Sequence, residues 1–161
     1  MPDIKHLAPN EWLMLRDVRL LALQDSPQAF LATYEQENAY SMRRWQAEFA
    51  RGNWTVGLVD DNPVSLLGAT REPGTPTHQC YLEYLWVSPV CRRSGIARAM
   101  LTVVIERLRV AGVRTVFLWV LDGNDAALHL YQGMGFVSTN HRQPLPEQPA
   151  RSEERMRLEL G

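Results

Sequence analysis

The sequence predicts a single α+β domain over residues 1–161, a sandwich whose elements follow the order β-α-α-β-β-β-α-β-α-β-β. Short runs of branched and aromatic residues, typical of buried strands, alternate with longer runs whose apolar residues recur at helical spacing. In addition, 45% of the 161 residues are apolar, which is enough for one compact core. No internal repeat and no linker divides the chain.

The first third is expected to hold one strand and two helices. Residues 4–7 form a short strand, and the first helix begins near Asn10, a favourable N-cap. That helix ends at Asp25-Ser26-Pro27, because the residue before a proline disfavours the helical conformation. A second helix is expected over residues 41–51. The pattern between Phe30 and Tyr40 does not indicate an element.

The middle of the chain is expected to form three strands. Residues 53–59 and 64–70 are joined by Asp60-Asp61-Asn62-Pro63, a hairpin signal. The third strand, residues 81–87, is rich in aromatic and branched residues and ends before Pro89, which cannot donate to a sheet. The remaining elements are expected to be a helix from Gly95 to about Val110, a strand over 115–121, a helix from Asn124 to about Met134, a strand starting at 136–139, a proline-rich loop over 143–150 and a final strand over 155–160.

The composition narrows the possible partners and compartment. A formal net charge of −1 gives no electrostatic reason to expect nucleic acid or an anionic membrane as a partner. The first residues lack the pattern of a signal peptide, and no stretch has the length and apolarity of a membrane span. Cys80 and Cys91 are too few for a disulfide framework and fit a reducing compartment. We therefore expect a cytoplasmic protein. No cluster of His, Cys and Asp has metal-ligand spacing, so we expect no bound metal.

A basic turn connects the 81–87 strand to the helix that follows it. It reads Arg92-Arg93-Ser94-Gly95-Ile96-Ala97. A glycine at a helix start lets a ligand come close, and the N–H groups of the first helical turn face outward with the positive end of the helix dipole. Because two arginines lie in the same turn, it is a candidate cradle for a diphosphate.

Two motifs in this part of the chain resemble those of a known family. R-x-x-G-x-A, formed by Arg92, Gly95 and Ala97 after V-x-P, resembles the acetyl-CoA signature Q/R-x-x-G-x-G/A of the GNAT superfamily of N-acetyltransferases. Residues 124–136 resemble the second GNAT signature, N-x-x-A-x-x-L-Y-x-x-x-G-F. Its defined positions are filled by Asn124, Ala127, Leu130, Tyr131, Gly135 and Phe136. The resemblance implies the GNAT fold, a mixed, mainly antiparallel central sheet flanked by helices.

The resemblance also implies a cofactor and the place where it binds. In GNAT enzymes the strand equivalent to 81–87 separates from the one equivalent to 115–121, and the pantetheine arm of acetyl-CoA lies in the gap like an added strand. The Val87 N–H is the implied donor to the thioester carbonyl. Asn124 is a helix cap by composition and a hydrogen-bond partner of the cofactor by resemblance. The implied cofactor-binding residues are Leu85, Trp86, Val87, Arg92, Arg93, Ser94, Gly95, Ile96, Ala97 and Asn124.

Tyr131 and Glu83 are the candidate catalytic residues. By its motif position Tyr131 is the general acid that protonates the CoA thiolate; the alternative is a half-buried helix tyrosine bonded to the backbone. Glu83 is the only carboxylate of the 81–87 strand, and strand alternation predicts that it shares a face with Leu85 and Val87. It is either the general base or a salt-bridged core residue, and some family members carry the base two positions earlier, where this chain has Tyr81. Further candidates lie in the segment that shapes the acceptor pocket in related enzymes: Glu35 and Glu37 for the base, Phe30 and Glu35 for acceptor binding.

The leading functional hypothesis is an N-acetyltransferase that moves the acetyl group of acetyl-CoA to a primary amine by direct attack in a ternary complex. The acceptor is a small molecule or a peptide, and a homodimer is compatible with the family. A non-catalytic CoA-binding sensor or interaction module on the same fold is the alternative. A dinucleotide-binding domain fits less well, because a single glycine marks the helix start and the hairpins before it argue against repeated βαβ units.

Overall fold

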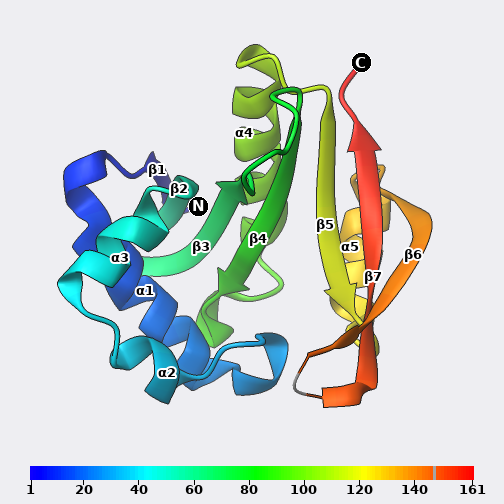
Figure 1. The fold of residues 1–161 in the computed structure, drawn as a ribbon. Coiled ribbons are helices and arrows are strands. Elements are labelled where there is room, and N and C mark those ends of the chain that lie inside the picture. The colour runs from blue at the N-terminus through cyan, green and yellow to red at the C-terminus, as the bar shows by residue number, and fades with distance from the viewer. Residues whose placement is uncertain (147) are drawn as a thin grey trace.

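A computed structural model describes residues 1–146 and 148–161. Glu147, which falls in the loop predicted over 143–150, lies outside this part. The described residues form seven strands and five α-helices, with single 3₁₀ turns between some of them (Figure 1). The elements are β1 (Asp3–His6), α1 (Trp12–Asp25), α2 (Tyr34–Asn38), α3 (Met42–Phe49), β2 (Gly52–Val59), β3 (Asn62–Thr70), β4 (Gln79–Val87), α4 (Ile96–Val110), β5 (Thr115–Leu121), α5 (Asp125–Gly133), β6 (Val137–Leu145) and β7 (Gln148–Glu159).

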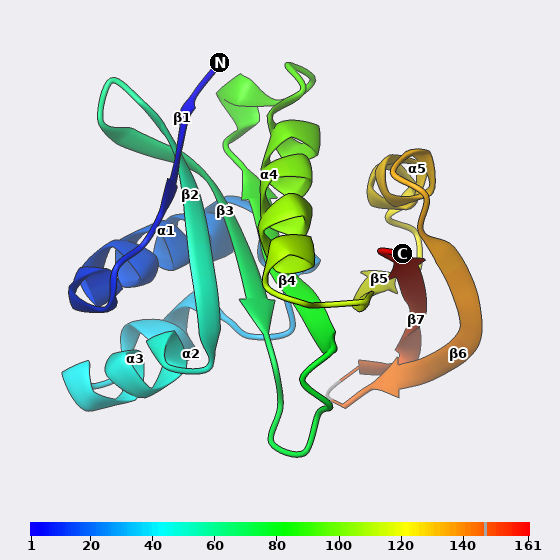
Figure 2. The same ribbon diagram turned by 90° about the horizontal axis from the view of Figure 1, so that it is seen from above.

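The strands form one mixed sheet in the order β1-β2-β3-β4-β5-β7-β6. Within the described part of the chain, β4 and β5 are the one parallel pair, and all other neighbours run antiparallel. Figure 2 shows helices on both faces, with α1, α2 and α3 on one and α4 and α5 on the other. The predicted fold class, a mainly antiparallel sheet flanked by helices, is confirmed.

Each face of the sheet has its own apolar core. On the α1 face, the buried side chains belong to α1 and to strands β2, β3 and β4: Leu15, Val18, Ala22, Trp54, Val56, Leu66 and Trp86. On the opposite face, α4 and α5 pack on β4, β5 and β7 through a larger set that includes Leu82, Met100, Leu101, Leu118, Tyr131 and Phe136. Burial of these side chains is the main stabilising contribution of both faces. No helix in the described residues is both long and apolar enough to cross a bilayer.

The N-terminal helices differ from the prediction in two details. Asn10 is not an N-cap, because it lies inside a 3₁₀ turn over Pro9–Glu11, where the Glu11 carboxylate accepts a hydrogen bond from the Ala8 N–H at 2.9 Å. A short helix that the pattern did not indicate, α2, begins after Thr33. The Thr33 hydroxyl accepts from the Gln36 N–H at 3.2 Å, so a capping box starts this helix despite the absence of an apolar stripe.

The predicted loop over 143–150 is also mostly wrong, because β6 continues to Leu145 and β7 begins at Gln148. Pro144 lies opposite Ser152 within this hairpin. The strand tolerates a proline because β6 is the edge of the sheet, where one side of the backbone has no neighbouring strand to bond.

Candidate active site

The parallel strands β4 and β5 separate along their length. In the described residues they pair from Gln79 to Tyr81 with Thr115 to Phe117, and not beyond. Strand β5 keeps its other edge paired with β7 all the way to Leu121. A wedge therefore opens between the C-terminal ends of β4 and β5, as Figure 1 shows.

The backbone of β4 faces this wedge at Val87. The Ser88 N–H donates to the Val64 carbonyl at 2.7 Å, and Val87 lies opposite Ser65 in the register of β3 and β4. Because backbone groups alternate in direction along an antiparallel strand, the N–H and C=O of Val87 point away from β3, toward the wedge. The Val87 carbonyl accepts from Arg92 Nε at 2.9 Å, and the N–H remains directed into the gap.

A cavity of about 320 Å³ passes through the sheet at this opening. On the α4 and α5 side its lining includes Leu101, Asn124, Ala127 and Tyr131. On the α1 side it includes Arg19, Phe30, Glu83, Trp119 and Glu153, together with the loop between α1 and α2. The cavity therefore gives access to one point from both faces of the sheet.

A β-bulge at Tyr84 changes the direction of the β4 side chains. Tyr84 has a φ of 65°, and the register with β3 shifts next to it. Glu83 and Tyr84 consequently lie on the α1 side, whereas Leu85 and Val87 pack against the α4 core. The prediction that Glu83 shares a face with Leu85 and Val87 is wrong, because the extra residue of a bulge inverts the alternation.

The side chain of Trp86 points away from the wedge. It is buried in the α1 core, and its Nε1 donates to Asp25 Oδ2 at 3.0 Å. Arg92 Nη2 reaches the same oxygen at 2.6 Å and also Ser26 Oγ at 3.1 Å. Burial opposes ionisation of Asp25, but hydrogen bonds from Ser26 and Trp86 and the charge of Arg92 outweigh it and lower the pKa of this carboxyl. Both Trp86 of β4 and Arg92 of the basic turn thus bond Asp25, the last residue of α1.

The basic turn has the backbone shape that its glycine predicts. Arg93 and Gly95 both have positive φ, 61° and 83°, and Gly95 is the N-cap of α4. In the described residues, a Cβ on Gly95 would meet no atom within 4 Å, so conformation rather than space requires glycine here. The side chain of Ile96, the first residue of α4, is buried in the core. The N–H groups of this first helical turn have no partner within the helix and face outward. Alternating backbone conformations of this kind form a concavity for anions.

Tyr131 is a buried residue of α5 on the α4 and α5 side of the cavity. Its ring contacts Phe136 edge to face, with centroids 5.8 Å apart. Burial raises the pKa of Tyr131 to about 12, so the phenol keeps its proton at any physiological pH. Asn124 caps the same helix by accepting from the Ala127 N–H at 3.2 Å, which confirms the interpretation of Asn124 as a cap.

Glu83, on the α1 side of the cavity, forms an ion pair with Arg51. Its Oε1 accepts from Arg51 Nη2 at 2.8 Å, and Arg51 also bonds Glu48 at 2.9 Å. Burial would lower the pKa of Arg51, but the charge of Glu83 and the hydrogen bond and charge of Glu48 outweigh it and raise that pKa. Two residues earlier, Tyr81 stacks on Phe117 with centroids 5.2 Å apart.

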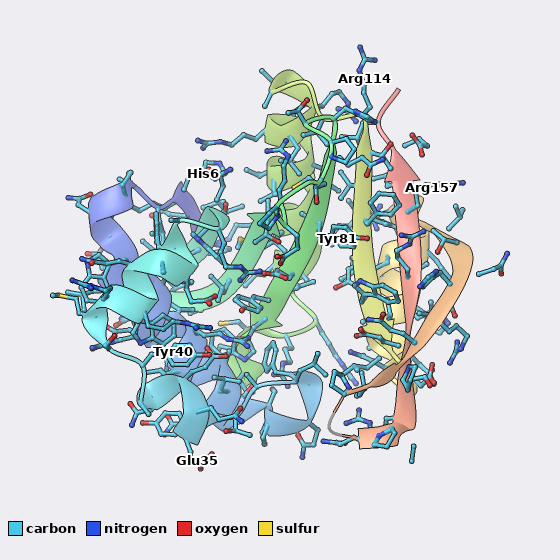
Figure 3. All side chains as sticks on the ribbon, in the orientation of Figure 1. His6, Glu35, Tyr40, Tyr81, Arg114 and Arg157 are labelled. Carbon is cyan, nitrogen blue, oxygen red and sulfur yellow. The ribbon has the colours of Figure 1, made fainter. Side chains whose placement is uncertain are left out.

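The segment before α3 contributes less to the cavity than predicted. Phe30 lines it, but Glu35 does not; Figure 3 shows Glu35 on the outer side of α2. Glu37 is buried in a two-pronged ion pair with Arg19, with both hydrogen bonds at 3.0 Å. The Arg19 guanidinium lies 3.8 Å from the Tyr84 ring centroid and 4.5 Å from that of Phe30. Glu37 is thus paired with Arg19 and is not part of the cavity lining.

Arg19 and Glu153 are the charged residues of the cavity lining that the sequence did not indicate. No role was predicted for either residue: Arg19 lies in the first predicted helix, and Glu153 lies between the loop predicted over 143–150 and the strand predicted over 155–160. Recognising β7 from Gln148 onward would have placed Glu153 on the face of Leu121, its partner in the register. Among the residues that the structure describes, no group of His, Cys, Asp and Glu could hold a metal ion.

Comparison with known proteins identifies the family. The model of the acetyltransferase (GNAT) family matches residues 17–136, which include the wedge, the basic turn and α5. The chain belongs to the GNAT acetyltransferase family. Members of this family use acetyl-CoA as their cofactor, and a putative acetyltransferase from Salmonella typhimurium was solved with it. That structure matches 100% of the chain with a TM-score of 0.79 and 15% identity, covering 95% of its own chain.

Two further N-acetyltransferases resemble the chain, one in sequence and one in fold. N-acetyltransferase family 8 member 2 of Rattus norvegicus is 37% identical over 97 residues, which are 60% of this chain and 39% of the relative. The chain thus spans less than half the length of this curated relative. The ribosomal-protein-alanine N-acetyltransferase of Brucella melitensis shares the fold, with a TM-score of 0.75 and 18% identity over 98% of this chain and 99% of that one.

Proposed function

We propose that this protein transfers the acetyl group of acetyl-CoA to a primary amine, by direct attack of the amine in a ternary complex. The observation that carries the proposal is the cavity that crosses the sheet between β4 and β5. It allows a cofactor on the α4 and α5 side to meet an acceptor on the α1 side. Tyr131 lies on the first side, and Glu83 on the second.

The residues of the first side fit acetyl-CoA. The backbone of Arg92, Arg93, Ser94, Gly95, Ile96 and Ala97 would hold the diphosphate through N–H groups at the start of α4. The free edge of β4 at Leu85 and Val87 would bond the amides of the pantetheine arm. Trp86 would contribute backbone only, because its side chain lies in the α1 core.

Two groups of the chain fit the charges that develop during transfer. Bound acetyl-CoA supplies a thioester whose carbonyl carbon an amine can attack. The Val87 N–H, directed into the wedge, would donate to the oxygen on which negative charge develops. Tyr131 would then give its proton to the departing sulfur and regain one from the acetylated nitrogen, which loses it as the amide forms. The first step suits a phenol kept protonated by burial.

We propose Glu83 as the group that receives the proton of the incoming ammonium, directly or through water. Its carboxylate lines the acceptor side of the cavity, where its Oε1 accepts from Arg51 Nη2 at 2.8 Å. Phe30 would form part of the acceptor wall. The acceptor is a small molecule or a peptide, and the cytoplasm is the proposed compartment, in keeping with two free thiols, Cys80 and Cys91.

The proposal is tested by CoA release. The protein is incubated with acetyl-CoA and single amines, polyamines, amino acids or peptides, and the free thiol is followed together with the mass of the acetylated product. We expect release that depends on the amine and a product heavier by one acetyl group. Calorimetric binding of CoA without transfer to any amine of a broad panel would favour the non-catalytic sensor instead.

A further inference from the structure

Glu153 is a buried carboxylate without a cation. Glu153 is 8% exposed and lines the cavity from β7. Gln143 Nε2 donates to its Oε1 at 2.6 Å, and within the described residues no Lys, Arg or His comes within ion-pair distance of it. A buried carboxylate is costly unless a charge of opposite sign or several donors compensate it.

The other ionised side chains that line this cavity have ion-pair partners. Arg19 is neutralised by Glu37, and Glu83 by Arg51. Burial raises the pKa of both lining tyrosines, Tyr84 and Tyr131, to about 12, so they remain neutral. Among the residues that line this first cavity, Glu153 is thus the carboxylate without an ion-pair partner, and the ammonium group of a bound amine would supply one.

An apolar cavity of about 240 Å³ lies directly beside this charge. It shares Phe30, Leu31, Ala32 and Leu121 with the first cavity, and Leu121 is the register partner of Glu153. Leu145 and Pro146 complete its apolar wall, with Gln148 and Arg151 as the remaining polar lining. Leu31 is 54% exposed, so its side chain is accessible to a ligand in this cavity.

We propose that the acceptor is a primary amine carried on a hydrophobic body. Glu153 binds its ammonium group, and the apolar cavity between the α1–α2 loop and the β6–β7 hairpin binds the body. This assignment rests on the proposed acetyltransferase function and specifies the substrate class of the same site. Glu153 is a binding residue here, and Glu83 keeps the role of proton acceptor.

The charge contact is tested by binding rather than turnover. Calorimetry with saturating CoA compares 2-phenylethylamine with 2-phenylethanol, which has the same body and no ammonium. Glu153→Gln should lower the affinity for the amine by about tenfold or more and leave the affinity for the alcohol unchanged. The reason is that a hydrogen bond to a charged group is lost only for the amine. Glu154→Gln is the matched control: it removes the same charge from the neighbouring residue, which lies opposite Val120 on the other face.

The apolar contact is tested by substrate preference. Leu31→Ser should lower the ratio of kcat/KM for 2-phenylethylamine over ethanolamine by about fivefold. Leu21→Ser is the control, because Leu21 is a similarly exposed leucine of α1 that is not part of either lining. Steady-state kinetics also check the charge contact: in Glu153→Gln, the KM for 2-phenylethylamine should rise while kcat changes little.

The two proposals fail in different ways. Transfer to amines with equal 2-phenylethylamine affinity in Glu153→Gln and the parent protein would overturn the assignment of Glu153 and leave the acetyltransferase proposal intact. An unchanged substrate preference in Leu31→Ser would overturn the hydrophobic body. If no amine in the panel releases CoA, the proposed function falls, and the acceptor assignment falls with it.

Discussion

At the scale of single residues, Tyr131 gives the sharpest test of catalysis. Tyr131→Phe keeps the ring and its edge-to-face contact with Phe136 but removes the only proton that the residue can donate. We expect turnover to fall roughly a hundredfold while the affinity for acetyl-CoA barely changes. Steady-state kinetics and calorimetry on the same preparation measure both quantities.

The pKa of Tyr131 adds a second expectation. Since burial raises it to about 12, ionisation of the phenol cannot produce an alkaline loss of rate below about pH 10 in the parent protein. If Tyr131→Phe turns over as fast as the parent, Tyr131 is a packing residue of α5 and the proton comes from elsewhere.

Glu83 is tested by its pH profile. As the acceptor of the ammonium proton it must be ionised, so the rate should fall at acidic pH as the carboxylate is protonated. In Glu83→Gln we expect a lower rate and no acid limb attributable to this group. A mutant that retains the acid limb per folded molecule, but unfolds more easily because Arg51 has lost its partner, would make Glu83 a structural residue.

At the scale of elements, the turn into α4 decides cofactor binding. Gly95→Ala and Gly95→Glu both pay the cost of a left-handed conformation, about 1 kcal/mol, because the φ of Gly95 is 83°. Only the glutamate also brings a negative charge to the diphosphate position. We expect calorimetry to give an affinity for acetyl-CoA about tenfold or more weaker in Gly95→Glu than in Gly95→Ala. Equal affinities in the two variants would remove this turn from the cofactor site.

The same elements show how far sequence reasoning reaches. The turn and α5 could be predicted, because Gly95 and Asn124 have local roles at helix starts that leave a readable pattern. The bulge could not, because Tyr84 takes its positive φ without a glycine to mark it. Its stabilising contacts are distant in sequence: the ring stacks on Trp54 and on the Arg19 guanidinium.

The position of Glu153 was hidden for a related reason. Its role depends on a register, since β7 lies between β5 and β6 and places Glu153 beside Leu121 and Gln143. Prolines in the hairpin mask this strand pairing, because an edge strand tolerates residues that are typical of loops. The pairing of β7 with β5 and β6 is what buries Glu153 in the cavity lining.

At the scale of the whole molecule, the site is a consequence of how the two halves of the sheet are joined. Strands β1 to β4 are covered by α1 and α4, while β5, β7 and β6 carry α5 (Figure 2). Within the described residues, the halves meet in the sheet only at the short parallel pairing that begins at Gln79 and ends at Tyr81. Each half can therefore complete its own strand pairing while the wedge stays open to ligands, and the apolar core on the α4 and α5 side joins the two halves.

Burial of ionisable groups in these cores predicts how stability depends on pH. Burial raises the pKa of Cys80 to about 11 and of Tyr84 and Tyr131 to about 12, from 9.0 and 10.0. Because each folded-state pKa lies above its unfolded value, these groups lose protons first in the unfolded chain. Their contribution is complete below about pH 9 and declines as the pH rises toward 12.

The free energy of unfolding in urea, measured between about pH 8 and pH 11, should therefore fall with pH, with an unchanged dependence on urea concentration. Tyr131→Phe removes one of the three groups, so its decline should be shallower than that of the parent by about 1 kcal/mol at about pH 11. The comparison needs no cofactor or acceptor and depends only on the burial of the phenol in the folded chain. Parallel declines for the two proteins would mean that the Tyr131 hydroxyl is solvated, and would weaken its assignment as a donor kept protonated inside the cavity.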